Sequence, residues 1–305
     1  MAALYKANEI MEDLFKRGIN AQDQTYNNLR DSKKNWRIEA RRFCEQLWQN
    51  FYPYADNHFL IEIQRDFYSR FWEMYLACSL MEMGAKIFCP KPGPDIGIDT
   101  NNGTIWFEAV APGAGAPNSK DRVKIHKDFE DYNVPEEQII LRYRNAIYEK
   151  YNTKYFEYIE KGIVKKDDPY VIAINGCKIP SSRTDINPPR IVRSILPIGF
   201  PQVTFDKKSN IITNQTYQYR DRVTKNSGSD VSTKIFFNDF YNNLSAILFS
   251  NVDPTNRSKL FGQDYILTHN HRANNPVQKA IIKRGVEYRV KEFSDKFELS
   301  SSDLK

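Results

Sequence analysis

The stretch 95–110, DIGIDTNNGTIWFEAV, constrains the fold more than any other part of this 305-residue chain. Ile96 and Ile98 alternate with small or polar residues, as in a half-buried strand, and the apolar run IWF begins a second strand. The sequence NNG between them is typical of a tight turn, because Asn and Gly tolerate the positive φ that such turns require. We therefore expect two adjacent antiparallel strands, with Asp95 at the start of the first and Glu108 near the end of the second.

A helix is expected immediately before this hairpin. Phe71, Tyr75 and Cys78 recur at the spacing of one helix face. The pattern predicts a helix over 57–84, with a glycine at its end as the stop signal. Glu73 lies on this helix and is the third acid of the segment.

Two further acids, Glu62 and Asp66, fall near the same helix stripe as Glu73. They have two interpretations. They face the same site as Glu73, or they form surface pairs with Arg65 or Arg70.

Asp95 and Glu108 carry the chemical hypothesis. Carboxylates on neighbouring strands suit Mg²⁺, which prefers oxygen ligands and often bridges to a phosphate. Such an ion polarises a phosphoryl group and lowers the pKa of an attacking water. The pattern therefore points to hydrolysis of a phosphodiester.

The helix glutamate, the Pro-Asp pair at 94–95 and the sequence EAV at 108–110 together resemble the PD-(D/E)xK nuclease superfamily. The resemblance implies a restriction-endonuclease-like fold and a restriction-type or repair-type nuclease acting on DNA. It also implies Mg²⁺, with Mn²⁺ as a substitute, bound by Asp95, Glu108 and Glu73. The chain departs from the motif at Val110, which stands where the family has a lysine.

The resemblance therefore requires a lysine from elsewhere. Lys150 and Lys154 lie on a helix expected over 135–161, and Lys120 lies in the loop that follows Glu108. Lys178 is a further candidate. The alternative for the helix lysines is ordinary solvated surface.

The expected fold class is α/β, with a mixed sheet flanked by helices. The run 170–175, YVIAIN, is the clearest buried strand, and a long helix before it indicates a parallel crossover. A further strand is expected at 244–249. We divide the chain into a helical N-terminal region (1–56), a nuclease-like core (57–193) and a β-rich C-terminal extension (194–305) packed on that core.

Composition adds modest constraints. A formal charge of +6, from 44 basic and 38 acidic side chains, suits a polyanionic partner such as DNA. No apolar run is long enough to span a membrane, so a cytoplasmic protein is expected. The four cysteines are scattered and indicate no zinc site. His269 and His271 form a His-x-His pair without an evident third ligand.

Two other interpretations stay open. Val110 marks either a displaced lysine or a lost active site, in which case the chain binds nucleic acid or a protein without cleaving it. Otherwise Asp95 caps a turn and Glu108 pairs with an arginine in an unrelated α/β domain. A homodimer is compatible with each interpretation.

Overall fold

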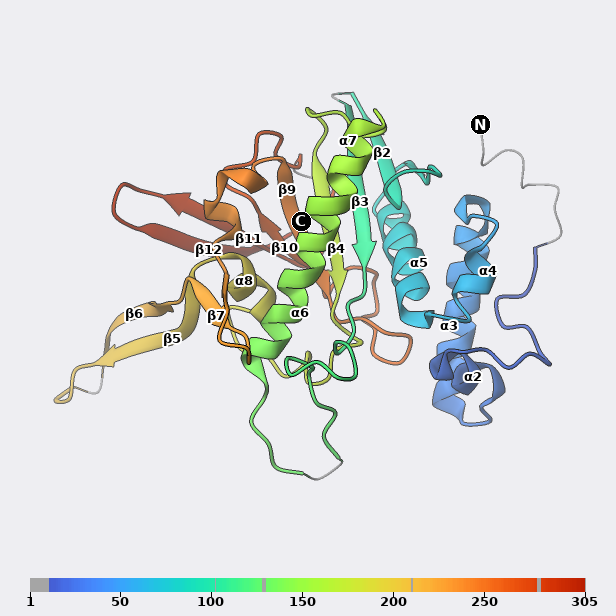
Figure 1. The fold of residues 1–305 in the computed structure, drawn as a ribbon, viewed down its shortest axis with the longest axis horizontal. Coiled ribbons are helices and arrows are strands. Elements are labelled where there is room, and N and C mark those ends of the chain that lie inside the picture. The colour runs from blue at the N-terminus through green and yellow to red at the C-terminus, as the bar shows by residue number, and fades with distance from the viewer. Residues whose placement is uncertain (1–10, 102, 128–129, 210, 279–280, 305) are drawn as a thin grey trace.

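The computed structural model describes residues 11–101, 103–127, 130–209, 211–278 and 281–304. Within these residues an eight-stranded mixed sheet forms the centre of the molecule, as Figure 1 shows. In spatial order its strands are β1 (Ile87–Phe88), β2 (Ile96–Thr100), β3 (Gly103–Val110), β4 (Tyr170–Asn175), β9 (Leu244–Ser250), β10 (Ile266–His269), β11 (Val286–Glu292) and β12 (Phe297–Asp303).

The middle of the sheet is parallel, since β3, β4 and β9 run in the same direction. Every residue of β4 is buried. Val171 and Ala173 pack into one apolar core, whereas Ile172 and Ile174 pack into another on the opposite face. A strand covered on both faces has no polar side, which explains its continuous apolar sequence. The mixed α/β sheet and the parallel crossover into β4 agree with the sequence-based expectation.

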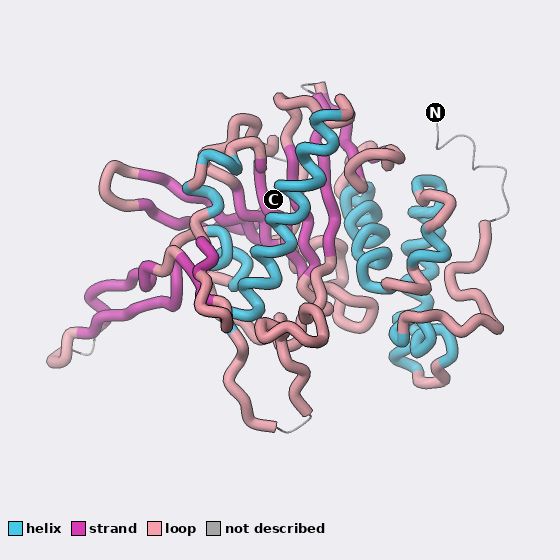
Figure 2. Tube along the Cα trace, viewed as in Figure 1, coloured by secondary structure: helices cyan, strands magenta, loops and turns pink. Residues whose placement is uncertain are grey.

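Helices cover both faces of the sheet (Figure 2). On one face lies α5 (Phe67–Glu82), where the Trp72 indole donates a hydrogen bond to the Ala173 carbonyl at 2.9 Å. The N-terminal helices pack outside it: α2 (Gln24–Asp31), α3 (Asn35–Phe51) and α4 (Phe59–Glu62). On the other face lie α6 (Glu136–Glu149), α7 (Phe156–Glu160) and α8 (Arg190–Ile195).

The single helix expected over 57–84 is wrong in one respect. The chain forms the short α4, leaves helical geometry, and starts again as α5. Asp66 causes the new start, because its carboxylate accepts from the backbone N–H of Ser69 and caps the second helix. This carboxylate therefore acts first as a helix cap.

The helix expected over 135–161 is nearly continuous. Between α6 and α7 the chain forms a π-helical turn, Lys150–Tyr155. Such turns often occur at functional sites, because they shift the side chains that follow them around the helix. Here the turn begins at one of the candidate lysines.

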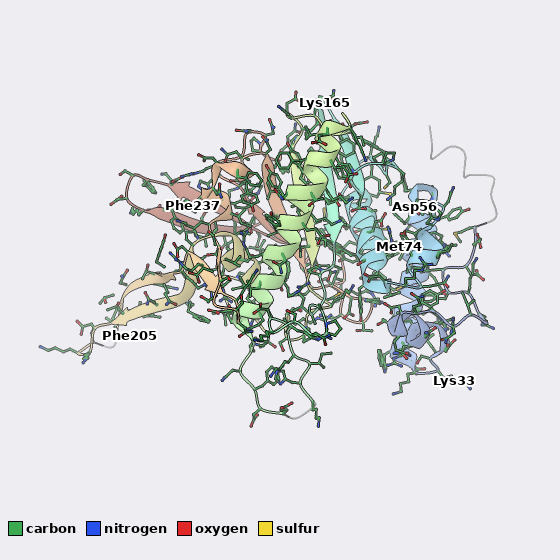
Figure 3. The ribbon with its side chains drawn as sticks, in the orientation of Figure 1. Lys33, Asp56, Met74, Lys165, Phe205 and Phe237 are labelled. Atoms are coloured by element: carbon green, nitrogen blue, oxygen red, sulfur yellow. The ribbon has the colours of Figure 1, made fainter. Side chains whose placement is uncertain are left out.

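The C-terminal part of the chain completes the sheet. Its residues supply β9 to β12, so the sheet extends across the boundary placed between 193 and 194. Two separate hairpins precede them: β5 (Ile198–Phe205) with β6 (Ile212–Tyr219), and β7 (Arg222–Thr224) with β8 (Asp230–Ser232). The first hairpin projects from the body, and Phe205 near its tip is labelled in Figure 3.

The hairpin between β2 and β3 follows the expected register, with Thr100 paired to Gly103. Gly103 adopts a positive φ of 113°, as the turn sequence requires. Asn102 of that turn and residues 1–10 of the predicted N-terminal region lie outside the described residues. Among the helices that are described, none has the length and apolar character needed to cross a membrane.

Candidate functional site

Asp95 lies immediately before β2, one residue beyond the pair formed by Ile96 and Phe107. This register brings it beside Glu108 on β3. Its Oδ2 accepts a hydrogen bond from the backbone N–H of Ala109 at 2.8 Å. Among the described residues its Oδ1 accepts no hydrogen bond, and that carboxylate is 19% exposed. One oxygen is therefore fixed by the sheet, while the other makes no hydrogen bond among the described residues and lies 4.0 Å from the Lys91 ammonium.

Glu108 faces the α6 side of the sheet, as Trp106 does, because side chains alternate along a strand. Its carboxylate is 3% exposed. Lys150 donates from Nζ to Oε1 at 2.7 Å, and the Tyr158 hydroxyl lies 3.4 Å from Oε2. Both partners come from the segment around the π-helical turn. The π-helical turn thus places Lys150 against Glu108 on β3.

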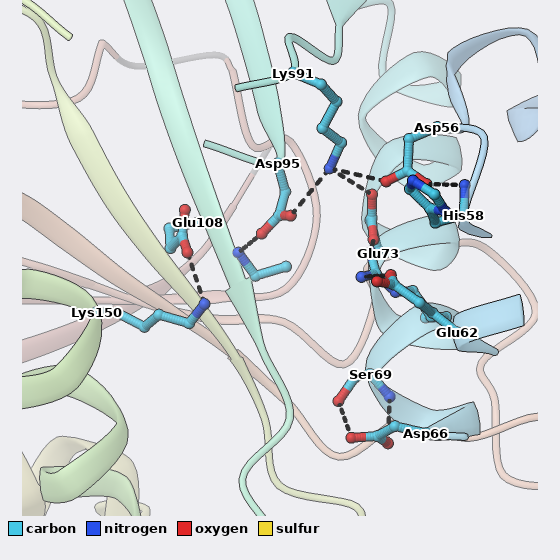
Figure 4. A network of polar contacts seen from close by, with 12 residues as sticks. Asp56, His58, Glu62, Asp66, Ser69, Glu73, Lys91, Asp95, Glu108 and Lys150 are labelled. Carbon is cyan, nitrogen blue, oxygen red and sulfur yellow. Dashed lines mark hydrogen bonds and ion pairs between the residues drawn. The ribbon is translucent and has the colours of Figure 1, made fainter. Parts of the chain in front are cut away.

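Glu73 reaches the site from α5, on the other face of the sheet. Its buried carboxylate pairs with the Arg70 guanidinium, which also binds Glu62. Figure 4 shows Asp95 between Glu108 on one side and Glu73 on the other. The three predicted acids therefore form two neighbouring pairs that share Asp95.

Lys91 is a site residue that the sequence patterns did not identify. Its Nζ lies 3.8 Å from Glu73 Oε1 and 4.0 Å from Asp95 Oδ1. It also lies 3.5 Å from Asp56 Oδ2. The available signal was its place four residues before Asp95, in the sequence KPGPD, but only the folded loop turns it toward α5.

The glutamates are strongly perturbed by their surroundings. Burial, and then the negative charge of Asp95, raise the pKa of Glu73 and of Glu108 to about 7. Lys91 and Lys150 oppose these shifts. Burial disfavours the ammonium of each lysine, yet the facing carboxylates outweigh it and raise both lysine pKa values. The site therefore holds two acids that ionise near neutral pH beside two charged lysines.

These shifts predict that pH and stability are linked. Because both glutamate pKa values are raised from 4.5, the folded chain binds more protons than the unfolded chain between about pH 4.5 and about pH 7. In the absence of metal, the free energy of unfolding is therefore expected to decrease as the pH rises through that window. The decrease should be on the order of a few kcal/mol, since one pKa unit is about 1.4 kcal/mol.

Urea unfolding in EDTA, from about pH 5 to about pH 8, measures this dependence. A Glu108→Gln variant serves as the comparison, because it removes one of the two groups and keeps the other titrating residues. The difference in unfolding free energy between wild type and variant should change with pH. A difference that stays constant over the window would contradict the linkage.

A hollow of about 370 Å³ opens beside these residues. It lies where β2 and β3 approach the start of α5. Its walls include acidic, basic and apolar side chains: Asp66, Arg70, Glu73, Asp95, Val110 and Lys150. Asp95 and Lys150 thus border one space that a ligand can enter.

The other candidate lysines lie elsewhere. Lys154 pairs with Glu157 at 3.1 Å, and Lys178 pairs with Asp66 at 2.8 Å. Lys120 lines a different hollow. Of the lysines considered, Lys150 is therefore the one placed against Glu108.

The histidine pair is likewise separate. His269 lies 3.0 Å from Glu287, and His271 lies 3.1 Å from Glu292. His269 ends β10, His271 lies in the loop just after it, and both contact acids of β11. The two rings are held by different acids, which suits a structural role.

The residues at Asp95 fit Mg²⁺ by donor chemistry. Its Oδ1 has no hydrogen-bond donor among the described residues, and Glu108 supplies a second carboxylate from the adjacent strand. As the side chains stand, no group of three or more His, Cys, Asp or Glu in the described part of the chain is arranged as a metal site. Lys150 and Lys91 occupy the acids instead, so a cation would bind in competition with their ammonium groups.

Comparison with protein-family models, with curated proteins and with solved structures finds no match to this chain.

Proposed function

We propose that this chain is a Mg²⁺-dependent deoxyribonuclease with a restriction-endonuclease-like core. The observation that carries the proposal is the contact between Lys150 and Glu108. It supplies, from a helix, the lysine that Val110 replaces in the motif. The order of α5, the β1-β2-β3 meander, the α6 crossover and parallel β4 supports the same fold assignment.

Asp95 and Glu108 would hold the ion, with Glu73 as a further ligand or as the group that orients water. When bound, Mg²⁺ polarises the phosphoryl group and lowers the pKa of an attacking water. The backbone N–H of Ala109 holds the Asp95 carboxylate in one orientation. This fixed carboxylate limits the reorganisation needed for catalysis.

Glu73 is suited to accept a proton. Its pKa of about 7 means that the ionised and protonated forms are both populated near neutral pH. Arg70 and Lys91 contact its carboxylate and keep it at the edge of the hollow. Glu73 can therefore accept a proton from water near neutral pH.

Lys150 would stabilise the negative charge that develops on the phosphate. Its ammonium is bound to Glu108 and borders the hollow, so the positive charge is positioned before the substrate arrives. An ammonium positioned in this way lowers the barrier more than a mobile one would.

A non-catalytic protein of the same fold is the second candidate. The observation in its favour is that each glutamate already has a basic partner, Lys150 for Glu108 and Arg70 for Glu73. Acids neutralised in this way can be retained for stability alone. This candidate predicts no cleavage of DNA with either Mg²⁺ or Mn²⁺.

Incubation of the full chain with linear and supercoiled DNA tests the proposal. Cleavage is expected with Mg²⁺ and with Mn²⁺, and none is expected in EDTA, because the carboxylates alone do not activate water. Equal cleavage in EDTA would contradict the metal requirement. Intact DNA under all conditions, over a panel of sequences and methylation states, would favour the non-catalytic candidate.

A further inference from the structure

A second hollow of about 510 Å³ lies in the loop region that follows β3. Four basic side chains and two asparagines contribute to its walls: Lys120, Arg122, Lys124, His126, Asn133 and Asn226. No acidic side chain among the described residues lines it. The composition of its walls therefore favours an anion.

The loop around this hollow is held in place by contacts to other parts of the chain. Asn226, from the turn between β7 and β8, donates to the Asp121 carboxylate at 2.7 Å and to the Lys120 carbonyl at 2.6 Å. Arg122 donates to the Gly115 carbonyl at 2.6 Å. The basic residues are thus presented by an ordered segment.

The lysine and arginine side chains around this hollow are not neutralised by carboxylates of the described residues. In the part of the chain that the structure describes, Lys120, Arg122 and Lys124 form no ion pair with a carboxylate. The acids nearest to them in sequence have other contacts. Asp121 accepts from the Asn226 backbone, and Glu130 lies 3.6 Å from His126.

Further basic residues connect this hollow with the one at Asp95. Arg142 of α6 donates to the Gly113 carbonyl at 2.8 Å. Lys178 also lies close to Gly113, and it pairs with Asp66, which lines the first hollow. Basic residues therefore lie along the loop that leads from the carboxyl end of β3 toward Lys120. Figure 1 shows this loop running along the lower edge of the molecule.

We propose that this basic track, Lys178, Arg142, Arg122, Lys120 and Lys124, binds the phosphate backbone of duplex DNA beside the cleaved bond. The inference rests on the proposed nuclease function. Phosphates attract Lys and Arg and release their condensed counterions when the charges meet. A backbone that passes from the first hollow to the second would keep the scissile phosphate at Asp95.

The test measures binding without cleavage. The full chain is titrated in EDTA with a short fluorescein-labelled DNA duplex, and anisotropy is followed from about 50 mM to about 200 mM salt. The variant is Lys120→Ala with Lys124→Ala. The matched control is Lys207→Ala with Lys208→Ala, which removes the same charge from the exposed tip of the β5–β6 hairpin.

The track variant is expected to bind at least about fivefold more weakly, with a salt slope smaller by about two, because each lysine neutralises about one phosphate. The control should stay within about twofold of wild type, since its lysines lie outside the track. Equal losses of DNA affinity in the two variants would overturn the proposal that the track binds DNA. So would an absence of duplex binding by wild type, or a preference for RNA over DNA.

Failure of this proposal can be separated from failure of the nuclease assignment. If the track variant binds like wild type while wild type cleaves DNA with Mg²⁺, only the track is wrong. If the expected binding loss occurs but no metal supports cleavage, the track stands and the non-catalytic candidate is favoured.

Discussion

An Asp95→Asn variant is expected to lose DNA cleavage by about a thousandfold or more, because removing a metal carboxylate forfeits several kcal/mol of transition-state stabilisation. The substitution is nearly isosteric. The new amide oxygen can still accept from the Ala109 N–H, so the strand end should keep its geometry. Initial rates of Mg²⁺-dependent cleavage measure the loss.

The same variant should be more stable than wild type near neutral pH. Next to burial, the charge of Asp95 is the main cause that raises the pKa of Glu73 and of Glu108. Removing this charge lets both glutamates ionise at lower cost. Higher stability with lower activity is the expected behaviour of a site that stores electrostatic repulsion.

Asp99→Asn is the matched control for this prediction. Asp99 lies on the same strand, is exposed, and accepts a hydrogen bond from the Thr104 hydroxyl at 2.8 Å. Its replacement should leave both cleavage and the unfolding free energy close to wild type. Wild-type cleavage by Asp95→Asn would show that the acid pair does not carry the reaction.

Local patterns predicted those parts of the fold that depend on short-range signals. The turn sequence placed β2 beside β3, and the all-apolar run predicted β4 with its observed bounds. Strands β11 and β12 were missed, because neither is a continuous apolar run: β11 is mostly half-buried and β12 is largely exposed. Their place in the sheet follows from long-range pairing, which periodicity does not encode.

The break between α4 and α5 shows how one polar contact outweighs an apolar pattern. Leu60, Ile63 and Phe67 continue a helical repeat, yet the Asp66 carboxylate satisfies the N–H group of Ser69 and starts a new helix. The consequence reaches the candidate site. Asp66 is held at the rim of the first hollow, where it pairs with Lys178.

The three acids could be identified from the sequence because the helix and the two strands that carry them follow one another in a recognisable order. The basic residues could not be ranked in the same way. Lys150 and Lys154 share one predicted helix, and only the folded structure shows that Lys150, at the start of the π-helical turn, is the one that meets Glu108. The position of Lys91 in the site depends on the path of a proline-rich loop. Positions set by irregular backbone are those that sequence patterns specify least.

A Lys150→Ala variant is expected to reduce cleavage by about a hundredfold to a thousandfold, the usual effect of removing one preorganised electrostatic group from an active site. The loss should appear in the rate of the chemical step and not in DNA affinity, since Lys150 is half-buried, pairs with Glu108 and lies off the basic track. Single-turnover cleavage and binding in EDTA separate the two quantities.

Lys154→Ala is the control for this last prediction, because Lys154 comes from the same turn but pairs with Glu157. Losing Lys150 also leaves Glu108 buried without its ammonium, which should raise the glutamate pKa further and shift the pH profile of cleavage to higher pH. A merely structural lysine would lower the rate equally at all pH values. A rate loss with an unchanged pH profile, or an equal loss in Lys154→Ala, would therefore remove Lys150 from the proposed mechanism.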